Sequence, residues 1–182
     1  MGDEKANSIK DLTSETFGLI IAFLLPGVVG VIALSFWSTT AKTVLQSFLS
    51  DKANVNLFLL VIIVSLAIGL LLAALRGLIF EGWSPANRRL SANDFAKLGI
   101  PEKFVAFRGA VDAHYRYHQC WGGLAVVLPL LYAGWLKDNY AVSDCSGLIL
   151  PTVCFVAFEA ASAWAAWESY GKYVTRARAI LS

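Results

Sequence analysis

The stretch Leu57-Phe-Leu-Leu-Val-Ile-Ile-Val-Ser-Leu-Ala-Ile-Gly-Leu-Leu-Leu-Ala-Ala-Leu75 carries no charged side chain, and Ser65 is its one hydroxyl. A helix rises about 1.5 Å per residue, so about 20 apolar residues cross the hydrocarbon core of a bilayer. Backbone polar groups find no water there, so a spanning segment of this kind must be helical. The stretch therefore predicts a transmembrane helix, which we extend to residues 57–80.

Three further apolar segments of similar length predict spans at residues 17–37, 120–136 and 148–167. Of the 182 residues, 57% are hydrophobic and 15% are charged, and the mean hydropathy is +0.61. Soluble domains typically carry about 25% charged residues. The sequence predicts an all-α membrane protein that forms a single membrane domain over residues 1–182, with four transmembrane helices and a small helical cap.

The distribution of lysine and arginine predicts the orientation. Twelve of the 15 basic residues lie in parts that share one side of the membrane, and Lys42, Lys52 and Lys137 lie on the other. Basic residues accumulate on the cytoplasmic side. We therefore expect a multi-pass inner-membrane protein with both termini cytoplasmic. Its cytoplasmic parts are residues 1–16, 81–119 and 168–182, and its outer loops are 38–56 and 137–147.

The cytoplasmic cap at residues 81–119 carries helix start and stop signals. Ser91 followed by Asp94 resembles a capping box, and Gly99 is placed to end the short helix that the box begins. Pro101 then suits the first position of another helix. The cap is therefore predicted to be helical.

Glu159 lies near the middle of the fourth predicted span, where a carboxylate is costly and should face protein or water. Helical spacing places it in a stripe of small and polar residues. One interpretation is that this stripe lines a pore in an oligomer, and the other is a protonated carboxyl bonded to a neighbouring group. The candidate pore-lining residues are Thr152, Phe155, Glu159, Ser162 and Ala166.

Small residues recur every four positions along the second span, at Ser65, Gly69, Ala73 and Gly77. Such a seam favours close packing of helices, within or between subunits. Pro26-Gly27 in the first span and Pro129 in the third can kink a helix. Kinks of this kind serve gating in some proteins, but membrane helices commonly tolerate them.

Cations and aromatic rings alternate in His114-Tyr-Arg-Tyr-His118, at the end of the cap. Arginine binds phosphate, and bases stack on aromatic rings, so this composition suits a nucleotide. The alternative is that basic residues lie here because of topology and anionic lipid alone. The candidate ligand-binding residues are Arg88, Arg89, Arg108, Tyr115, Arg116 and Tyr117.

The sequence contains no enzyme motif, neither a phosphate-binding glycine loop nor a nucleophile elbow nor a paired-cysteine metal site. His114 and His118 have the i,i+4 spacing of metal ligands but no evident third ligand, so packing is the better interpretation. The three cysteines share no metal-ligand spacing, and we expect no disulfide within the chain. We predict no catalytic residue, no metal and no cofactor.

A charged tail, then Phe17-Gly-Leu-Ile-Ile-Ala-Phe-Leu-Leu-Pro-Gly27, four spans and a small basic helical cap resemble the membrane effectors of prokaryotic anti-phage nucleotide-signalling systems. Within that group the chain is most similar to the Hailong-type transmembrane effector. The resemblance implies a homo-oligomeric channel, a tetramer. It also implies a partner nucleotidyltransferase that makes an oligodeoxyadenylate, which opens the pore and harms the infected cell.

These observations together predict an oligomeric ion-channel effector that a nucleotide or oligonucleotide opens at its basic cytoplasmic face. A non-conducting membrane scaffold or partner subunit is the alternative. A small transporter is a third hypothesis, but four spans are few for one unless two copies insert in opposite orientations. The strong positive-inside bias argues against such dual insertion.

Overall fold

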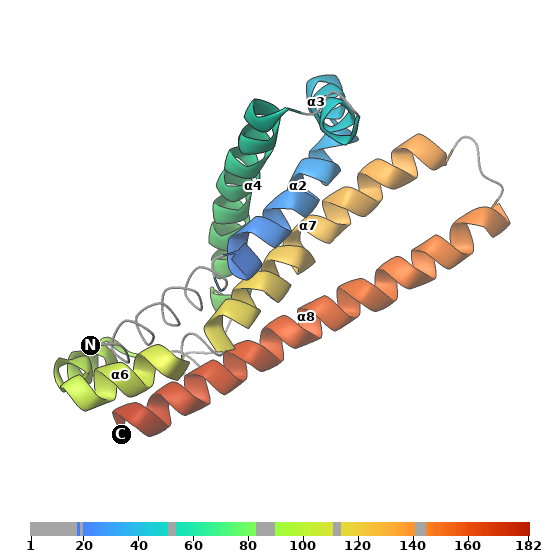
Figure 1. The fold of residues 1–182 in the computed structure, drawn as a ribbon. Helices are drawn as coiled ribbons and strands as arrows, with labels where there is room; N and C mark the ends of the chain where they lie inside the picture. The colour runs from blue at the N-terminus through green and yellow to red at the C-terminus, as the bar shows by residue number, and fades with distance from the viewer. Residues whose placement is uncertain (1–17, 19, 51–53, 83–89, 111–113, 141–144) are drawn as a thin grey trace, which may run out of the picture.

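The computed structural model describes residues 18, 20–50, 54–82, 90–110, 114–140 and 145–182, and helices make up nearly all of them (Figure 1). No strand occurs in these ranges. The elements in chain order are η1 (Ile20–Leu24), α2 (Leu25–Ser35), α3 (Thr39–Leu49), α4 (Val55–Arg76), η2 (Gly77–Glu81), α5 (Ala92–Ala96), η4 (Lys97–Gly99), α6 (Pro101–Ala110), α7 (Arg116–Asn139) and α8 (Cys145–Leu181).

The apolar segments of the sequence form the long helices. Three of them are long and apolar enough to cross a membrane, namely Val55–Glu81, Arg116–Asn139 and Gly147–Leu181. A fourth span results if Ala22–Ser35 and Thr39–Leu49 count as one, although these helices are bent by 119° relative to each other. The all-helical prediction is thus confirmed for the described residues, and the helices are compatible with a multi-pass membrane protein.

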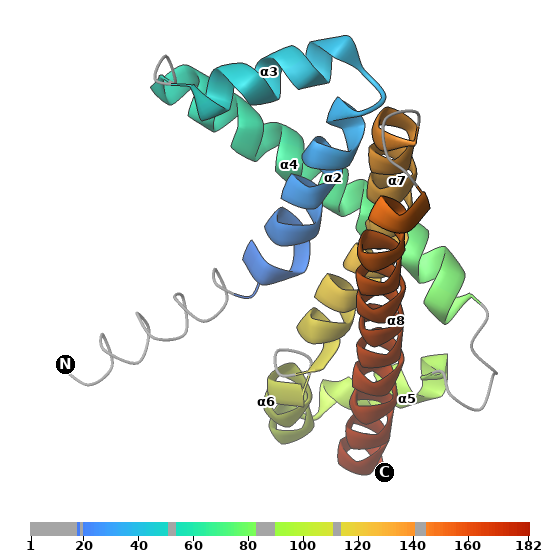
Figure 2. The same cartoon turned by 90° about the vertical axis from the view of Figure 1, so that its right-hand side faces the viewer.

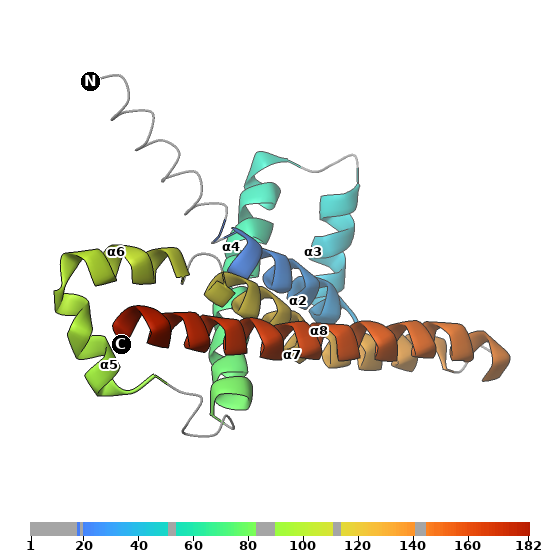
Figure 3. The same cartoon turned by 90° about the horizontal axis from the view of Figure 1, so that it is seen from below.

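Helices α2, α4 and α7 pack together, and α8 packs along α7. The central cluster of buried side chains joins Ala33 of α2, Leu72 of α4 and Val127 of α7. Figure 3 shows that α4 runs across α7 and α8 rather than alongside them, whereas α2 follows α7 in Figure 1. The arrangement therefore differs from a bundle of four aligned helices.

Glycines set the point at which α2 and α4 cross. A Cβ atom added to Gly27 would lie 1.8 Å from the Ser65 carbonyl oxygen, and one added to Gly69 would lie 2.0 Å from the Phe23 carbonyl oxygen. The two backbones are therefore in direct contact, which only glycine permits. Half of the predicted small-residue seam thus packs within the chain, whereas a Cβ on Gly77 would meet no atom within 4 Å.

The structure is helical in two places where the sequence predicted a loop or a tail. The outer loop predicted at 38–56 contains α3, which begins where the Ser38 hydroxyl accepts a hydrogen bond from the Ala41 amide. Helix α8 continues to Leu181, through the cytoplasmic tail predicted at 168–182. It continues because its last turns are covered: Tyr173, Val174 and Ala177 are buried there against neighbouring residues of the cap.

The cap contains the short helices that its start and stop signals predict. The Ser91 hydroxyl accepts a hydrogen bond from the Asp94 amide, and the Asp94 carboxylate accepts one from the Ser91 amide, so the capping box is confirmed. Helix α6 begins at Pro101 and packs against the C-terminal part of α8. Figure 2 shows α5 and α6 beside that end of α8.

Candidate functional site

Arg76, the last residue of α4, points into the protein and is only 3% exposed. Its side chain passes over Gly122 of α7, where a Cβ atom would lie 2.6 Å from the arginine Cγ and Cδ atoms. The next residue, Gly123, makes similar room for Pro26 of α2. The Gly122-Gly123 pair therefore allows the buried Arg76 side chain and Pro26 of α2 to contact the same turn of α7.

Glu81 supplies the counter-charge for Arg76. The Arg76 guanidinium donates to Glu81 Oε1 at 2.7 Å. The two residues are five apart, and they lie on the same side of the chain because α4 ends in the wider π-helical turn η2. In that turn the Gly82 amide bonds to the Gly77 carbonyl. A continuing α-helix would have separated them around the helix axis.

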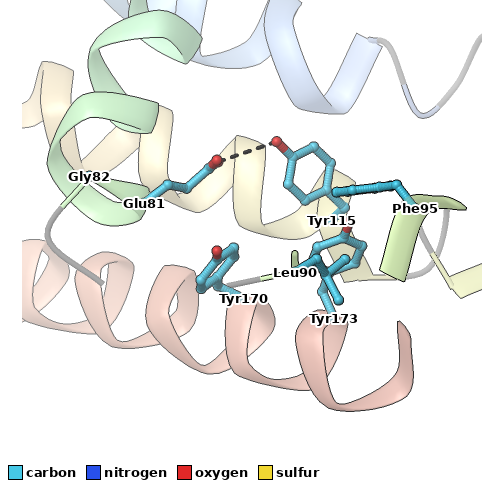
Figure 4. Close-up of a pocket in the computed structure, with 7 residues that line it drawn as sticks. All are labelled: Glu81, Gly82, Leu90, Phe95, Tyr115, Tyr170 and Tyr173. Carbon is cyan, nitrogen blue, oxygen red and sulfur yellow. Dashed lines mark hydrogen bonds between the residues drawn. The ribbon is translucent and has the colours of Figure 1, made fainter. Parts of the chain in front are cut away.

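The same carboxylate oxygen accepts a hydrogen bond from the Tyr115 hydroxyl at 3.2 Å (Figure 4). Burial raises the pKa of the Tyr115 phenol above its ordinary value, and the negative charge of Glu81 raises it further. The phenol therefore keeps its proton at neutral pH and acts as a donor. The Arg76 guanidinium carbon lies 5.5 Å from the centre of the Tyr115 ring, a cation–π arrangement.

His118 connects this pair to α8. Its Nδ1 atom lies 2.8 Å from the Ala166 carbonyl oxygen, which can only accept, so Nδ1 carries a hydrogen. Its Nε2 atom lies 3.7 Å from Glu81 Oε1, and the ring is fully buried. Glu81 thus stands at a junction of α4, α7 and α8, which we call the Glu81 junction (Arg76, Glu81, Tyr115 and His118).

A cavity of about 370 Å³ opens beside this junction. Aromatic rings form most of its wall, and the rings of Tyr115 and Tyr173 lie 4.9 Å apart between centres. Figure 4 shows Tyr115 and Tyr170 nearest the Glu81 side chain, with Tyr173 below Tyr115. No lysine or arginine occurs among the described residues of the wall, so the cavity offers ring faces and one carboxylate acceptor. The lining residues are Glu81, Gly82, Leu90, Phe95, Tyr115, Tyr170 and Tyr173.

Of the six ligand-binding residues predicted from the sequence, Tyr115 lines this cavity. Arg88 and Arg89 lie outside the described residues. Arg108 is exposed on α6, and Tyr117 is 52% exposed and lies outside the cavity wall.

The Arg116 guanidinium group lies against Gly18, so closely that a Cβ atom added to Gly18 would collide with it. Of the four predicted residues that the structure describes, Tyr115 alone is in the cavity wall, and a shared binding surface for the six stays a prediction.

Basic residues instead gather on another face of α8. A second cavity, of about 510 Å³, is lined there by side chains that include Trp167, Lys172, Thr175, Arg176 and Arg178. Lys172 forms an ion pair with Glu168 at 2.8 Å. Phosphate groups suit such a surface because arginine and lysine neutralise their charge. These basic residues belong to the cytoplasmic tail that the sequence predicts at 168–182.

The five residues predicted to line a pore share the face of α8 that packs on α7. The Thr152 hydroxyl lies 2.6 Å from the Tyr132 hydroxyl, and the Phe155 ring stacks on Tyr132 with 4.2 Å between centres. Ser162 and Ala166 are fully buried, and Glu159 is partly buried. Within one chain this face is covered by α7, and its role in a pore stays a prediction.

No family model, curated protein or solved structure matches this chain. The candidate site therefore rests on its geometry. The sequence analysis did not predict Arg76 and Glu81 as site residues. Two signals were available: Arg76 directly follows a long apolar segment, and the Gly122-Gly123 pair lies inside a second apolar segment. Among the described residues, no three histidine, cysteine or acidic side chains are grouped to hold a metal, so His114 and His118 gain no third ligand.

Proposed function

We propose that this chain is a four-span membrane protein with both termini in the cytoplasm, and that its homo-oligomer is a channel opened by a ligand at the cytoplasmic end. Three helices of sufficient length and apolarity support the membrane location. Large apolar side chains on the outer faces of α4 and α8, such as Ile63, Leu71, Leu150 and Trp164, are exposed in the single chain. Lipid or further copies of the chain would cover them.

The observation that carries the proposal is the Glu81 junction beside an open cavity. One carboxylate oxygen holds Arg76 of α4 and Tyr115 next to α7, and it faces His118, which bonds to α8. A ligand that donates a hydrogen bond to Glu81 would compete with these partners. Binding at the cavity would therefore alter how three apolar helices meet, which is the coupling that a gated channel needs.

We propose a nucleotide or oligonucleotide as the ligand. Ring faces in the cavity suit a base, and stacking on aromatic side chains stabilises a bound base by about 1–3 kcal/mol. The second cavity provides Lys172 and Arg176 for phosphate groups on the same helix. The resemblance of the sequence to anti-phage effectors makes short oligodeoxyadenylates the first compounds to test, with a tetramer and a partner nucleotidyltransferase as the accompanying expectations.

The test is ion flux from liposomes that contain the purified protein, with and without short oligodeoxyadenylates. We expect flux that depends on the ligand. Phe95→Ala removes a ring from the cavity wall, and Phe104→Ala is its matched control, because Phe104 is similarly exposed in the cap but lies outside the wall. Phe95→Ala should raise the half-maximal ligand concentration by roughly tenfold, whereas Phe104→Ala should leave it unchanged.

A non-conducting scaffold is the second candidate. The observation that favours it is the packing of Thr152 and Phe155 against Tyr132, which covers the polar stripe of α8 within one chain. Liposomes that stay ion-tight with every ligand, although the protein is correctly inserted, would support the scaffold and reject the channel. Flux without any ligand would keep the pore and reject the sensor.

A further inference from the structure

The packing seam between α7 and α8 contains unsatisfied oxygen atoms at the depth of Glu159. Two contacts fix how the helices align: a Cβ atom on Gly122 would lie 3.8 Å from the Ala166 Cβ, and the Tyr132 ring stacks on Phe155. Glu159 and Ser162 lie between these contacts on α8. The stretch of α7 that faces them therefore lies between Gly122 and Tyr132.

Two side-chain oxygens in this stretch have no hydrogen-bond partner among the described residues. They are Ser162 Oγ, on a fully buried residue, and Glu159 Oε2, which is itself shielded from solvent. Buried polar atoms almost always have a partner, and an exception calls for an explanation such as a bound water or ion. The two residues are three apart on one helix, so their side chains share a face.

Helix α7 adds a third oxygen. Pro129 lies inside α7 and has no N–H, so the Ala125 carbonyl lacks its usual helical donor. Ala125 is three residues after Gly122 and seven before Tyr132, both of which contact α8, so it belongs to the same face of α7. The residue whose carbonyl Pro129 frees therefore lies at the same depth as Glu159 and Ser162 on the neighbouring helix.

Within α7 and α8, no fixed cation balances Glu159. Helix α7 has no lysine or arginine between Arg116 and Lys137, and α8 has none before Lys172, which is paired with Glu168. The titratable side chains that α7 presents toward α8 are His118 and Tyr132, at the two ends of the seam. An ionised carboxylate in an apolar span is costly without a counter-ion, so Glu159 in this position holds either a proton or a mobile cation.

We propose that the Glu159 carboxylate, the Ser162 hydroxyl and the Ala125 carbonyl form a binding site for a small monovalent cation, Na⁺, which exchanges with a proton. All three ligands are oxygens, as hard cations require, and a single carboxylate suits one positive charge better than two. Carbonyls freed from helical bonding serve as Na⁺ ligands in other membrane proteins. The inference rests on the proposed membrane location of α7 and α8, but it needs no conducting pore.

The experiment is thermal unfolding of the purified protein in detergent at pH 8, with Na⁺ exchanged for choline at constant ionic strength. We expect Na⁺ to raise the Tm by about 2–4 °C, because an ion that binds only the folded state stabilises it. The rise should disappear in Glu159→Gln and shrink in Ser162→Ala. Glu168→Gln, which changes an exposed carboxylate of the same helix, should retain it.

Acidification should also weaken the effect of Na⁺, because a proton then occupies the Glu159 carboxyl. An equal Tm in Na⁺ and choline at pH 8 would overturn the proposal, as would a full Na⁺ effect in Glu159→Gln. If Glu159→Gln does not fold, binding of radioactive Na⁺ to the wild type and Ser162→Ala decides the matter. A scaffold that conducts no ions would still show the Na⁺ effect, so this test and the flux test fail independently.

Discussion

Replacing Gly69 by alanine should push α4 away from η1, the turn that leads into α2. The added Cβ would lie 2.0 Å from the Phe23 carbonyl oxygen, and ordinary contact begins at 3.4 Å, so the helices must separate by about 1.4 Å. The obstacle is backbone and cannot rotate away. Overpacking of this kind costs about 1–3 kcal/mol, which offsets the gain of about 1 kcal/mol that alanine brings to a helix.

The expected net loss for Gly69→Ala is therefore about 0–2 kcal/mol, which corresponds to a fall in Tm of up to about 8 °C for a chain of this size. Thermal unfolding of the purified protein in one detergent, followed by tryptophan fluorescence, measures it. The matched control is Gly77→Ala, eight residues further along the chain, where the new Cβ meets nothing within 4 Å. The control should match the wild type or exceed it.

Equal Tm values for Gly69→Ala and Gly77→Ala would refute the reasoning, because the two substitutions differ in the backbone that the methyl group meets. A large fall for Gly77→Ala with none for Gly69→Ala would mean that the seam packs between chains instead.

Three further substitutions have defined outcomes. Glu81→Gln leaves the buried Arg76 without its counter-charge and should lower stability by about 2–3 kcal/mol in thermal unfolding. This is the lower part of the range for truncating one partner of a buried charge pair, because the Glu81 side chain is 32% exposed. Tyr132→Phe removes the hydrogen bond to Thr152 but keeps the ring stack, so it should cost only about 0.5–1.5 kcal/mol in the same assay. Ser91→Ala removes the N-cap of α5 and should speed amide exchange in α5, with no change in α4. Hydrogen bonds from the Ser91 amide and hydroxyl hold the pKa of Asp94 below its ordinary value of 3.8, so protection of α5 in the wild type should persist above that pH and fall only in stronger acid.

Local signals in the sequence sufficed for most of the helices, but α3 lies in a segment that they predicted as a loop. The length of an apolar run is an intrinsic property, so α4, α7 and the membrane part of α8 could be placed from composition alone. The capping box at Ser91 and the start at Pro101 depend on neighbouring residues, and both were predicted correctly.

The crossing of α4 and the Glu81 junction depend on contacts between distant segments, and these were not predictable from one sequence. Arg76 and Glu81 come together through a π-helical turn, for which the residues give no clear signal. Hydropathy marked where α8 leaves the apolar region, but a change from apolar to mixed residues does not end a helix. Packing against the cap decides that it continues.

The length of α8 has a mechanical consequence. Its 37 residues extend about 55 Å, nearly twice the thickness of a bilayer core of about 30 Å. The bond from His118 to the Ala166 carbonyl holds the helix at a point about 32 Å from its first residue and about 22 Å from its last. If this stiff rod pivots there, a sideways shift of 1 Å at the cap end moves the far end by about 1.4 Å in the opposite direction. That motion must first break the contacts of Tyr132 with Thr152 and Phe155.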